Sequence, residues 1–434
     1  MKGFSVLIRR IALFAVVIMV CAVTLPGCGP ANSEIKPTPE QQNGPSTDAK
    51  KKYVGGQTKY EIDDKSVPAV NAANDFAFLF NAELIRQGEG SYIASPYAVF
   101  SAVRAIIAGA DELTRGEILK SLKFESEEDA EYGYFNVLNS LINSIKLSKK
   151  SGSIQMANAL VLGSEEALAE PFGGDLTEKY HMDIINAAAA VSGTDAINKW
   201  VNKKTDGYVT SLIDEWDPSA SLLLASSAYF SDQWKTPFDP SLVEKKAFHG
   251  TSGDKEMEFM VRSSTSLPYY EDGELQALCL DYLTGGRLML MLPKDGDVTK
   301  MMSGMNATRF ADITANLKNG AFKMYIPSFK LNAKTSLADT LRALGMDSLF
   351  DKEALTNTLL GQKTALSGAL HAASLEVGVT GSALNSVSAD RESSSKIDKG
   401  GKDLYFDKPF ALVLYAPTPG GGQILFTGVF DGVQ

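Results

Sequence analysis

The chain has 434 residues, of which 44% are hydrophobic and 22% charged, so it can build a large folded core and is not disordered over most of its length. Its 42 Lys and Arg against 52 Asp and Glu give a net charge of −10, which argues against nucleic acid as a partner. Three cysteines are too few for a disulfide framework, and three histidines leave little material for a metal centre. We therefore expect an acidic globular protein without a metal or other cofactor.

The first 27 residues have the pattern of a secretory signal peptide. Lys2, Arg9 and Arg10 precede an apolar run over residues 11–25, which is shorter than the roughly 20 residues that a transmembrane helix needs. The run ends in LPGC (25–28), which resembles the lipobox of bacterial lipoproteins. We expect residues 1–27 to be removed and Cys28 to anchor the protein, by a lipid, to the cell envelope or cell surface outside the cytoplasm. The alternative is an ordinary signal peptide followed by a chance cysteine.

Residues 28–66 are rich in Pro, Gln, Asn, Lys, Ser and Gly and contain few large apolar residues. Such a segment cannot bury enough surface to offset its conformational entropy, so we expect a flexible tether after the lipidated cysteine. Residues 67–434 contain no comparable polar, low-complexity segment before a Ser/Gly/Lys cluster at 388–402. We therefore interpret residues 67–434 as one domain.

The domain contains both helical and strand periodicities. Helices are predicted around residues 76–84, after Ser95-Pro96 as N-cap and first helical residue, around 197–201 up to Gly207, and over 337–344 up to Gly345. Strands are predicted at 222–230, 275–280, 287–292, 370–377, 410–415 and 423–429, with a hairpin at Gly285-Gly286. Helices early and strands late indicate an α+β fold with mainly antiparallel sheets.

No catalytic motif is present in the sequence. It has no G-x-S-x-G, H-E-x-x-H, P-loop or paired CxxC, and His181, His249 and His371 are scattered. Cys279 lies in an apolar stretch, where a buried small hydrophobic residue is the simpler interpretation. We therefore predict that the protein is not an enzyme.

A series of short segments spans residues 75–430 of the domain. They are SYIASPYAVF (91–100), AGADELTRGEIL (108–119), ANAL (157–160), INKWVNKKTDG (197–207), AYFSDQW (228–234), FDP (238–240), IPSFK (326–330), LGM (344–346), KPF (408–410) and LFTG (425–428). Each segment is weak evidence alone, but together, in this order and spacing, they resemble the serpin family of protease inhibitors.

The resemblance implies three mainly antiparallel β-sheets, about nine helices and an exposed reactive-centre loop near the C-terminus. It also implies a suicide inhibitor of serine or, in some members, cysteine proteases. The protease attacks the loop and forms an acyl-enzyme, and the cut loop then inserts into the main sheet as a new strand. We expect the loop at residues 381–405 and a monomeric inhibitor.

The resemblance assigns the hinge of this loop to Gly381, Ser382, Ala383 and Leu384. With Ser382 leading, alternation along an inserted strand directs Ser382, Leu384, Ser386 and Ser388 inward and Ala383, Asn385, Val387 and Ala389 outward. Residues 377–389 carry no charge, so their insertion would not bury an unpaired ion.

Several positions depart from the pattern of inhibitory members. Inhibitory members usually have an acidic residue two positions before the hinge glycine and a run of small residues after that glycine. Here Val379 and Thr380 precede Gly381, and Leu384-Asn385 interrupts the run of small residues. Beneath the opening sheet, Ala98 and Ser226 stand where the family has Ser and Asn, which leaves a reduced cluster of Ser95, Ser226 and His371. These departures favour the alternative, a non-inhibitory serpin-fold binding or structural protein whose loop is cleaved without trapping the protease.

The family's loop length places the scissile bond at Ser395–Lys396. Because this loop is a few residues longer than usual, Lys396–Ile397 is the second choice, and it would suit a trypsin-like protease. Arg391 lies too close to the hinge to allow full insertion. We therefore expect an extracellular target protease of the serine or cysteine type, with a trypsin-like enzyme as one candidate.

Overall fold

The computed structural model describes residues 53–54, 57–58, 63–88, 90–124, 131, 133–137, 140, 152–164, 166–360, 362–382 and 401–432. The chain divides into two units, residues 1–44 and 45–434, and every described residue belongs to the second unit. The predicted signal peptide, Cys28 and residues 383–400 of the predicted loop lie outside the described residues. Among the helices of the described part, none is long and apolar enough to cross a membrane.

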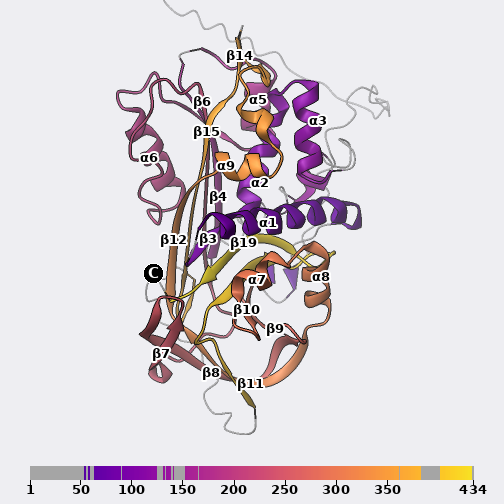
Figure 1. The fold of residues 1–434 in the computed structure, drawn as a ribbon, viewed down its shortest axis with the longest axis vertical. Coiled ribbons are helices and arrows are strands. Elements are labelled where there is room, and N and C mark those ends of the chain that lie inside the picture. Colours follow the sequence, from indigo (N-terminus) through magenta and orange to yellow (C-terminus); the bar gives the residue numbers. More distant parts are fainter. Residues whose placement is uncertain are drawn as a thin grey trace, which may run out of the picture. The chain divides into compact units, whose positions relative to one another are not determined.

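Most α-helices lie in the first half of the second unit, and most strands lie in its second half (Figure 1). The described helices are α1 (Val67–Gln87), α2 (Pro96–Ile106), α3 (Glu112–Ser121), α5 (Phe172–Glu178), α6 (Gly193–Lys204), α7 (Val298–Ser303), α8 (Ala307–Ala315) and α9 (Ala338–Ala343). The strands of the two large sheets are β3 (Tyr92–Ala94), β4 (Gly152–Leu162), β5 (Asp183–Asn186), β6 (Leu222–Gln233), β7 (Glu244–Gly250), β8 (Gly253–Glu271), β9 (Leu275–Asp281), β10 (Arg287–Pro293), β11 (Lys318–Pro327), β12 (Phe329–Ser336), β15 (Leu366–Val377), β16 (Gly381–Ser382), β17 (Lys402–Tyr405), β18 (Phe410–Ala416) and β19 (Gln423–Phe430). Two small ribbons pair β1 (Tyr53–Val54) with β2 (Gln57–Thr58) and β13 (Leu355–Leu359) with β14 (Gln362–Thr364).

The first large sheet has six strands in the order β12-β15-β16-β6-β4-β5. Its two long central strands, β15 and β6, run parallel to each other, whereas β6 and β4 are antiparallel along their whole length. Strand β6 is buried over residues 222–232, which is why its sequence is a continuous apolar and small-residue run rather than an alternating one. Helix α2 packs against one face of this sheet and α6 against the other.

The second large sheet has nine strands among the described residues. It consists of two parts, which the long strands β8 and β11 connect. Strand β8 pairs with β7 through its first half and with β9 through its last residues, and β11 follows β8 across both halves. One part continues through β9, β10, β18, β19 and β3, and the other ends at β17. Together with the six-stranded sheet, these two parts confirm the predicted α+β class and its three mainly antiparallel sheets.

Three apolar clusters fill the spaces between these layers. Alternate residues of β6, such as Leu224 and Phe230, join the largest cluster together with α2 and β19. The residues between them, such as Leu223 and Ala225, join a smaller cluster under α6. A further cluster packs α7 and α8 on β10 and β18, and it contains Cys279, whose burial raises the pKa of its thiol to about 12.

The local predictions are confirmed at most element ends. The Ser95 hydroxyl accepts a hydrogen bond from the Ala98 N–H, and Pro96 is the first residue of α2. The prediction that Gly207 ends the third helix is confirmed, because α6 stops at Lys204 and Gly207, with a φ of +84°, donates its N–H back to the Asn202 carbonyl at 2.8 Å. The Thr205 hydroxyl adds to this helix end by donating to the Val201 carbonyl and accepting the Val209 N–H.

Candidate functional site

The chain reverses direction at the end of β15 and returns into the sheet. Residues 378–380 form the turn, and the Gly378 N–H donates to the Gly381 carbonyl at 2.9 Å. The returning residues, Gly381 and Ser382, form β16. These two residues are the first half of the predicted hinge, whereas Ala383 and Leu384 lie outside the described residues.

Strand β16 lies between β15 and β6 and is antiparallel to both. Ser382 is in register with Val377 of β15 and with Asp232 of β6, and Gly381 is in register with Gln233. Earlier along both strands, β15 and β6 pair directly with each other, and the last direct pair is Ser374 with Tyr229. We call the place beyond that pair, where β16 separates the two strands, the sheet gap.

Gly381 is required in the sheet gap by the close approach of β6. A Cβ atom on this residue would lie 2.0 Å from the Asp232 carbonyl oxygen and 2.7 Å from the Gln233 Cα. Both neighbours are backbone atoms of a buried strand, which cannot move aside cheaply. The glycine that the sequence marked as a hinge therefore lets the returning chain enter between two strands.

The side chain of Ser382 points into a buried polar group beneath the sheet gap. Its hydroxyl lies 2.6 Å from the Tyr282 hydroxyl, and Ser382 is fully buried. The Asp232 carboxylate accepts hydrogen bonds from the Gln233 N–H at 2.7 Å, from the Thr284 N–H at 3.2 Å and from the Thr284 hydroxyl. Burial raises the pKa of Asp232 to about 7, although these hydrogen bonds act in the opposite direction.

Three backbone and side-chain hydrogen bonds hold the turn before the hinge. The Trp234 N–H donates to the Thr380 carbonyl at 3.0 Å, and its indole Nε1 donates to the Gly378 carbonyl at 2.8 Å. The Phe238 N–H donates to the Val379 carbonyl at 2.9 Å. The segment that follows β6 therefore fixes the path of the chain from β15 into the sheet gap.

The structure brings Ser95, Ser226 and His371 together further along the same pair of strands. The Ser95 N–H donates to Nε2 of His371 at 2.9 Å, so the ring proton lies on Nδ1, which faces the Ser226 hydroxyl at 3.1 Å. The Ser95 hydroxyl donates to the Leu425 carbonyl at 2.7 Å. Burial lowers the pKa of His371 to about 3, so the ring is neutral at physiological pH. A role of this cluster in opening the sheet stays a prediction.

Ala98 also belongs to this region, although it contributes only its backbone. Its carbonyl accepts a hydrogen bond from the Asn158 side-chain amide at 3.1 Å. An amide from β4 thus reaches the position where the family pattern has a second serine. The predicted scissile residues, Ser395, Lys396 and Ile397, lie outside the described residues.

Sequence reasoning missed Asp232, Tyr282 and the anchoring role of Trp234. A signal for Asp232 was available, because it is the first charged residue in a run that is otherwise apolar or small from residue 220 onward. Tyr282 gave no comparable signal, because its partner Ser382 lies 100 residues away in the chain.

Comparison with known proteins identifies the family. The family model described as "Serpin (serine protease inhibitor)" matches residues 71–431. The chain is a serpin. Members of this family are in general protease inhibitors rather than catalysts.

The relatives and solved structures similar to this serpin span most of its length. An uncharacterized serpin-like protein of Thermococcus kodakarensis is 26% identical, covering 97% of this chain and 98% of that protein. Serpin A3-1 of Bos taurus is 27% identical over 73% of this chain and 79% of its own. The native thermophilic serpin tengpin gives a TM-score of 0.77 at 21% identity, covering 86% and 96% of the two chains. Human thyroxine-binding globulin gives a TM-score of 0.75 at 23% identity, covering 84% of this chain and 98% of its own.

Proposed function

We propose that this serpin inhibits serine proteases as a suicide substrate, by inserting its cleaved loop between β15 and β6. The observation that carries the proposal is the position of β16, which already lies antiparallel between these strands. Insertion would extend an existing three-strand pairing, so no new nucleus is needed. Each added residue would find unpaired backbone groups on both sides once β15 and β6 separate.

The register of β16 predicts what the inserting residues would meet. Continued one residue at a time, it places Ser388 opposite Ser226 on β6 and His371 on β15. Its hydroxyl would then enter the polar cluster that β15 and β6 share before insertion. Ser382, which leads the predicted inward set, is fully buried, and this agrees with the inward face assigned to it.

Trapping is tested by incubating the purified protein with trypsin-like, elastase-like and subtilisin-like proteases. We expect a covalent complex that survives boiling in denaturant, and mass spectrometry of the released C-terminal peptide would decide between Ser395–Lys396 and Lys396–Ile397. A protease whose active-site serine has been blocked is the control and must give no such band. Cleavage without a complex, across the panel and at several ratios, would contradict inhibition.

A non-inhibitory role is the second candidate, and the sheet gap supplies its support. The buried carboxyl of Asp232 borders the entry of the inserting strand, and the larger residues Leu384 and Asn385 come soon after the hinge glycine. Either feature would slow insertion and let the protease hydrolyse the acyl bond. Thyroxine-binding globulin, a structural neighbour of this chain, has been solved with thyroxine, so the same fold also serves ligand binding in that protein.

The place of action proposed for this serpin is the outer side of a bacterial membrane. The support is the sequence of residues 1–28, with a lipid on Cys28 and residues 29–66 as a tether to a monomeric domain. Radiolabelled fatty acid incorporated in a bacterial host should label the wild type and leave Cys28→Ser unlabelled. Equal labelling of both would contradict the anchor without affecting the proposed inhibition.

A further inference from the structure

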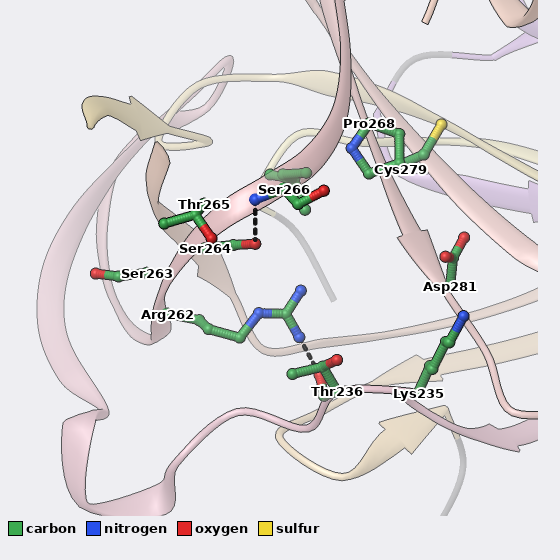
Figure 2. A pocket seen from close by; sticks show the side chains of 11 residues that line it. Lys235, Thr236, Arg262, Ser263, Ser264, Thr265, Ser266, Pro268, Cys279 and Asp281 are labelled. Atoms are coloured by element: carbon green, nitrogen blue, oxygen red, sulfur yellow. Dashed lines mark hydrogen bonds between the residues drawn. The ribbon is translucent and has the colours of Figure 1, made fainter. Parts of the chain in front are cut away.

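A polar pocket of about 370 Å³ lies beside the segment that anchors the hinge turn. Figure 2 shows Arg262 reaching into it from β8, between the hydroxyl residues that follow it on the same strand and the segment that carries Lys235 and Thr236. Leu267, Pro268 and Cys279 form its apolar wall. This volume is at the lower end of the range for small-molecule sites.

The charge in this pocket is opposite to that of the whole chain. Arg262 and Lys235 line it, and neither forms an ion pair with a carboxylate of the described residues. Asp281 is the acidic residue among the lining side chains, and its Oδ1 already accepts a hydrogen bond from Arg287 Nε at 2.8 Å. A protein with a net charge of −10 thus places two cations that form no ion pair with the described residues around one small cavity.

Arg262 is half-buried and has few partners for its five N–H groups. Its Nη1 donates to the Thr236 carbonyl, and its Nε is buried without a hydrogen-bond partner. The guanidinium lies 4.6 Å from the centre of the Phe238 ring, which fixes its plane. Burial lowers the pKa of Arg262 to about 10, with the Asp281 charge acting in the opposite direction, so the group stays charged at neutral pH. A partly buried guanidinium whose nearby carboxylate, Asp281, already pairs with Arg287 is unfavourable, and an anion would relieve that cost.

Hydroxyl groups complete the set of donors. Ser263, Ser264, Thr265 and Ser266 line one side of the pocket, and Thr236 lines the other. The Ser264 hydroxyl accepts the Ser266 N–H at 3.3 Å, which leaves its own proton available for donation. Guanidinium, ammonium and hydroxyl donors are the groups that bind phosphate and sulfate in proteins.

We propose that this pocket binds a small oxyanion, with Arg262 and Lys235 as its charged ligands. Binding there would act next to the hinge, because Lys235 directly follows Trp234, whose two N–H groups hold Gly378 and Thr380. The Lys235 N–H itself donates to the Asp281 carbonyl at 2.8 Å, so the pocket wall is part of the sheet framework. The indole of Trp234 therefore reports on occupancy.

The test uses the full-length protein with inorganic phosphate and sulfate as probes, titrated in a calorimeter at ionic strength held constant with potassium chloride. We expect saturable binding at one site, a rise in the melting temperature and a change in tryptophan fluorescence with the same midpoint. Arg262→Gln should weaken binding by about tenfold or more, since a hydrogen bond to a charged group is lost. Lys235→Gln should weaken it by a smaller factor.

The control is Lys199→Gln, which removes an exposed charge on α6 and should leave the affinity unchanged. If Arg262→Gln fails to fold, the comparison of Lys235→Gln with Lys199→Gln decides the question alone. The proposal is wrong if neither anion binds more strongly than chloride. It is also wrong if Lys235→Gln and Lys199→Gln bind with equal affinity, because the attraction would then be general surface charge.

Discussion

At the scale of single residues, the most consequential side chain is the buried carboxyl of Asp232. Its neighbours are Gln233, Thr284, Tyr282 and Ser382, none of which is a cation. The folded state raises its pKa from 3.8 to about 7, so between those pH values the folded protein binds more protons than the unfolded chain. Stability contributed by this residue therefore falls as pH rises through that range.

Replacing this carboxyl tests that direction. Asp232→Asn should raise the urea midpoint of unfolding at pH 8, by an amount corresponding to on the order of 2 kcal/mol, and should have little effect near pH 4. Chemical unfolding followed by circular dichroism at both pH values measures it. Asp297→Asn, on the surface at the start of α7, is a control for a lost carboxylate. A variant that is less stable at pH 8 would show that the carboxylate is favourable.

His371 produces the opposite pH dependence. Its pKa falls from 6.5 to about 3 on folding, so the unfolded chain binds the proton first as the pH is lowered. Stability should therefore be full above about pH 6.5 and decline towards pH 3. His371→Asn should flatten that decline in urea midpoints measured at pH 7, 5 and 4. It should also cost about 1–3 kcal/mol at pH 7, because the Ser95 N–H loses its acceptor. An unchanged slope between pH 7 and 4 would assign the acid sensitivity to other groups.

At the scale of elements, the proposed insertion would begin from the two-residue strand β16. Ser382→Arg places a charge against Tyr282 and Asp232 in a fully buried site. We expect the loop of this variant to be cleaved at the wild-type rate while complex formation falls by about tenfold or more, because insertion becomes slower than hydrolysis. Ser382→Thr, which keeps the hydroxyl, is the matched control. Stable complexes formed by Ser382→Arg at wild-type yield would contradict the insertion mechanism.

The register of β16 also predicts where insertion becomes costly. Continued along β6 and β15, it places Asp390 opposite Leu224 and Ala369, both of which are buried in the largest apolar cluster. Asp390→Ala should therefore increase the fraction of cleavage events that end in a covalent complex. Arg391→Ala is the matched control, because the same register turns residue 391 to the opposite face of the sheet. Titrations of residual protease activity measure both, and equal effects would show that the register does not continue.

At the scale of the whole molecule, insertion of the cleaved loop would separate β15 from β6, and this change in the main sheet would alter the melting temperature. If the cleaved loop inserts, the parallel pair becomes an antiparallel three-strand arrangement with new hydrogen bonds on both sides. Cleavage at Ser395–Lys396 or Lys396–Ile397 should then raise the melting temperature by at least about 10 °C. Differential scanning calorimetry before and after cleavage measures it, with cleaved Ser382→Arg as the control. An unchanged melting temperature would support the non-inhibitory alternative.

Most local structure could be predicted from the sequence because its causes are local. Ser95 and Pro96 begin α2 through a hydroxyl and a fixed backbone angle, and the apolar run that begins at Leu222 forms β6. The end of α6 was accessible too, because Gly207 takes a positive φ and bonds back to the Asn202 carbonyl, whereas the additional hydrogen bonds of Thr205 depend on the position of Val209. The α+β class was accessible from the order of helices and strands, and the family from its resemblance in short segments, which also pointed to Gly381 as the hinge glycine.

The candidate site was only half accessible, because its chemistry depends on which strands become neighbours. Sequence by itself determined that His371 lies on a strand, and the family resemblance assigned Gly381 and Ser382 after it to a hinge, which stays a prediction. The tertiary structure alone decided that Ser382 lies against Asp232 and Tyr282, and that Lys235 and Arg262 share a pocket. Burial and pKa follow from atoms brought together across tens to more than a hundred residues, and only the packed sheets establish those distances.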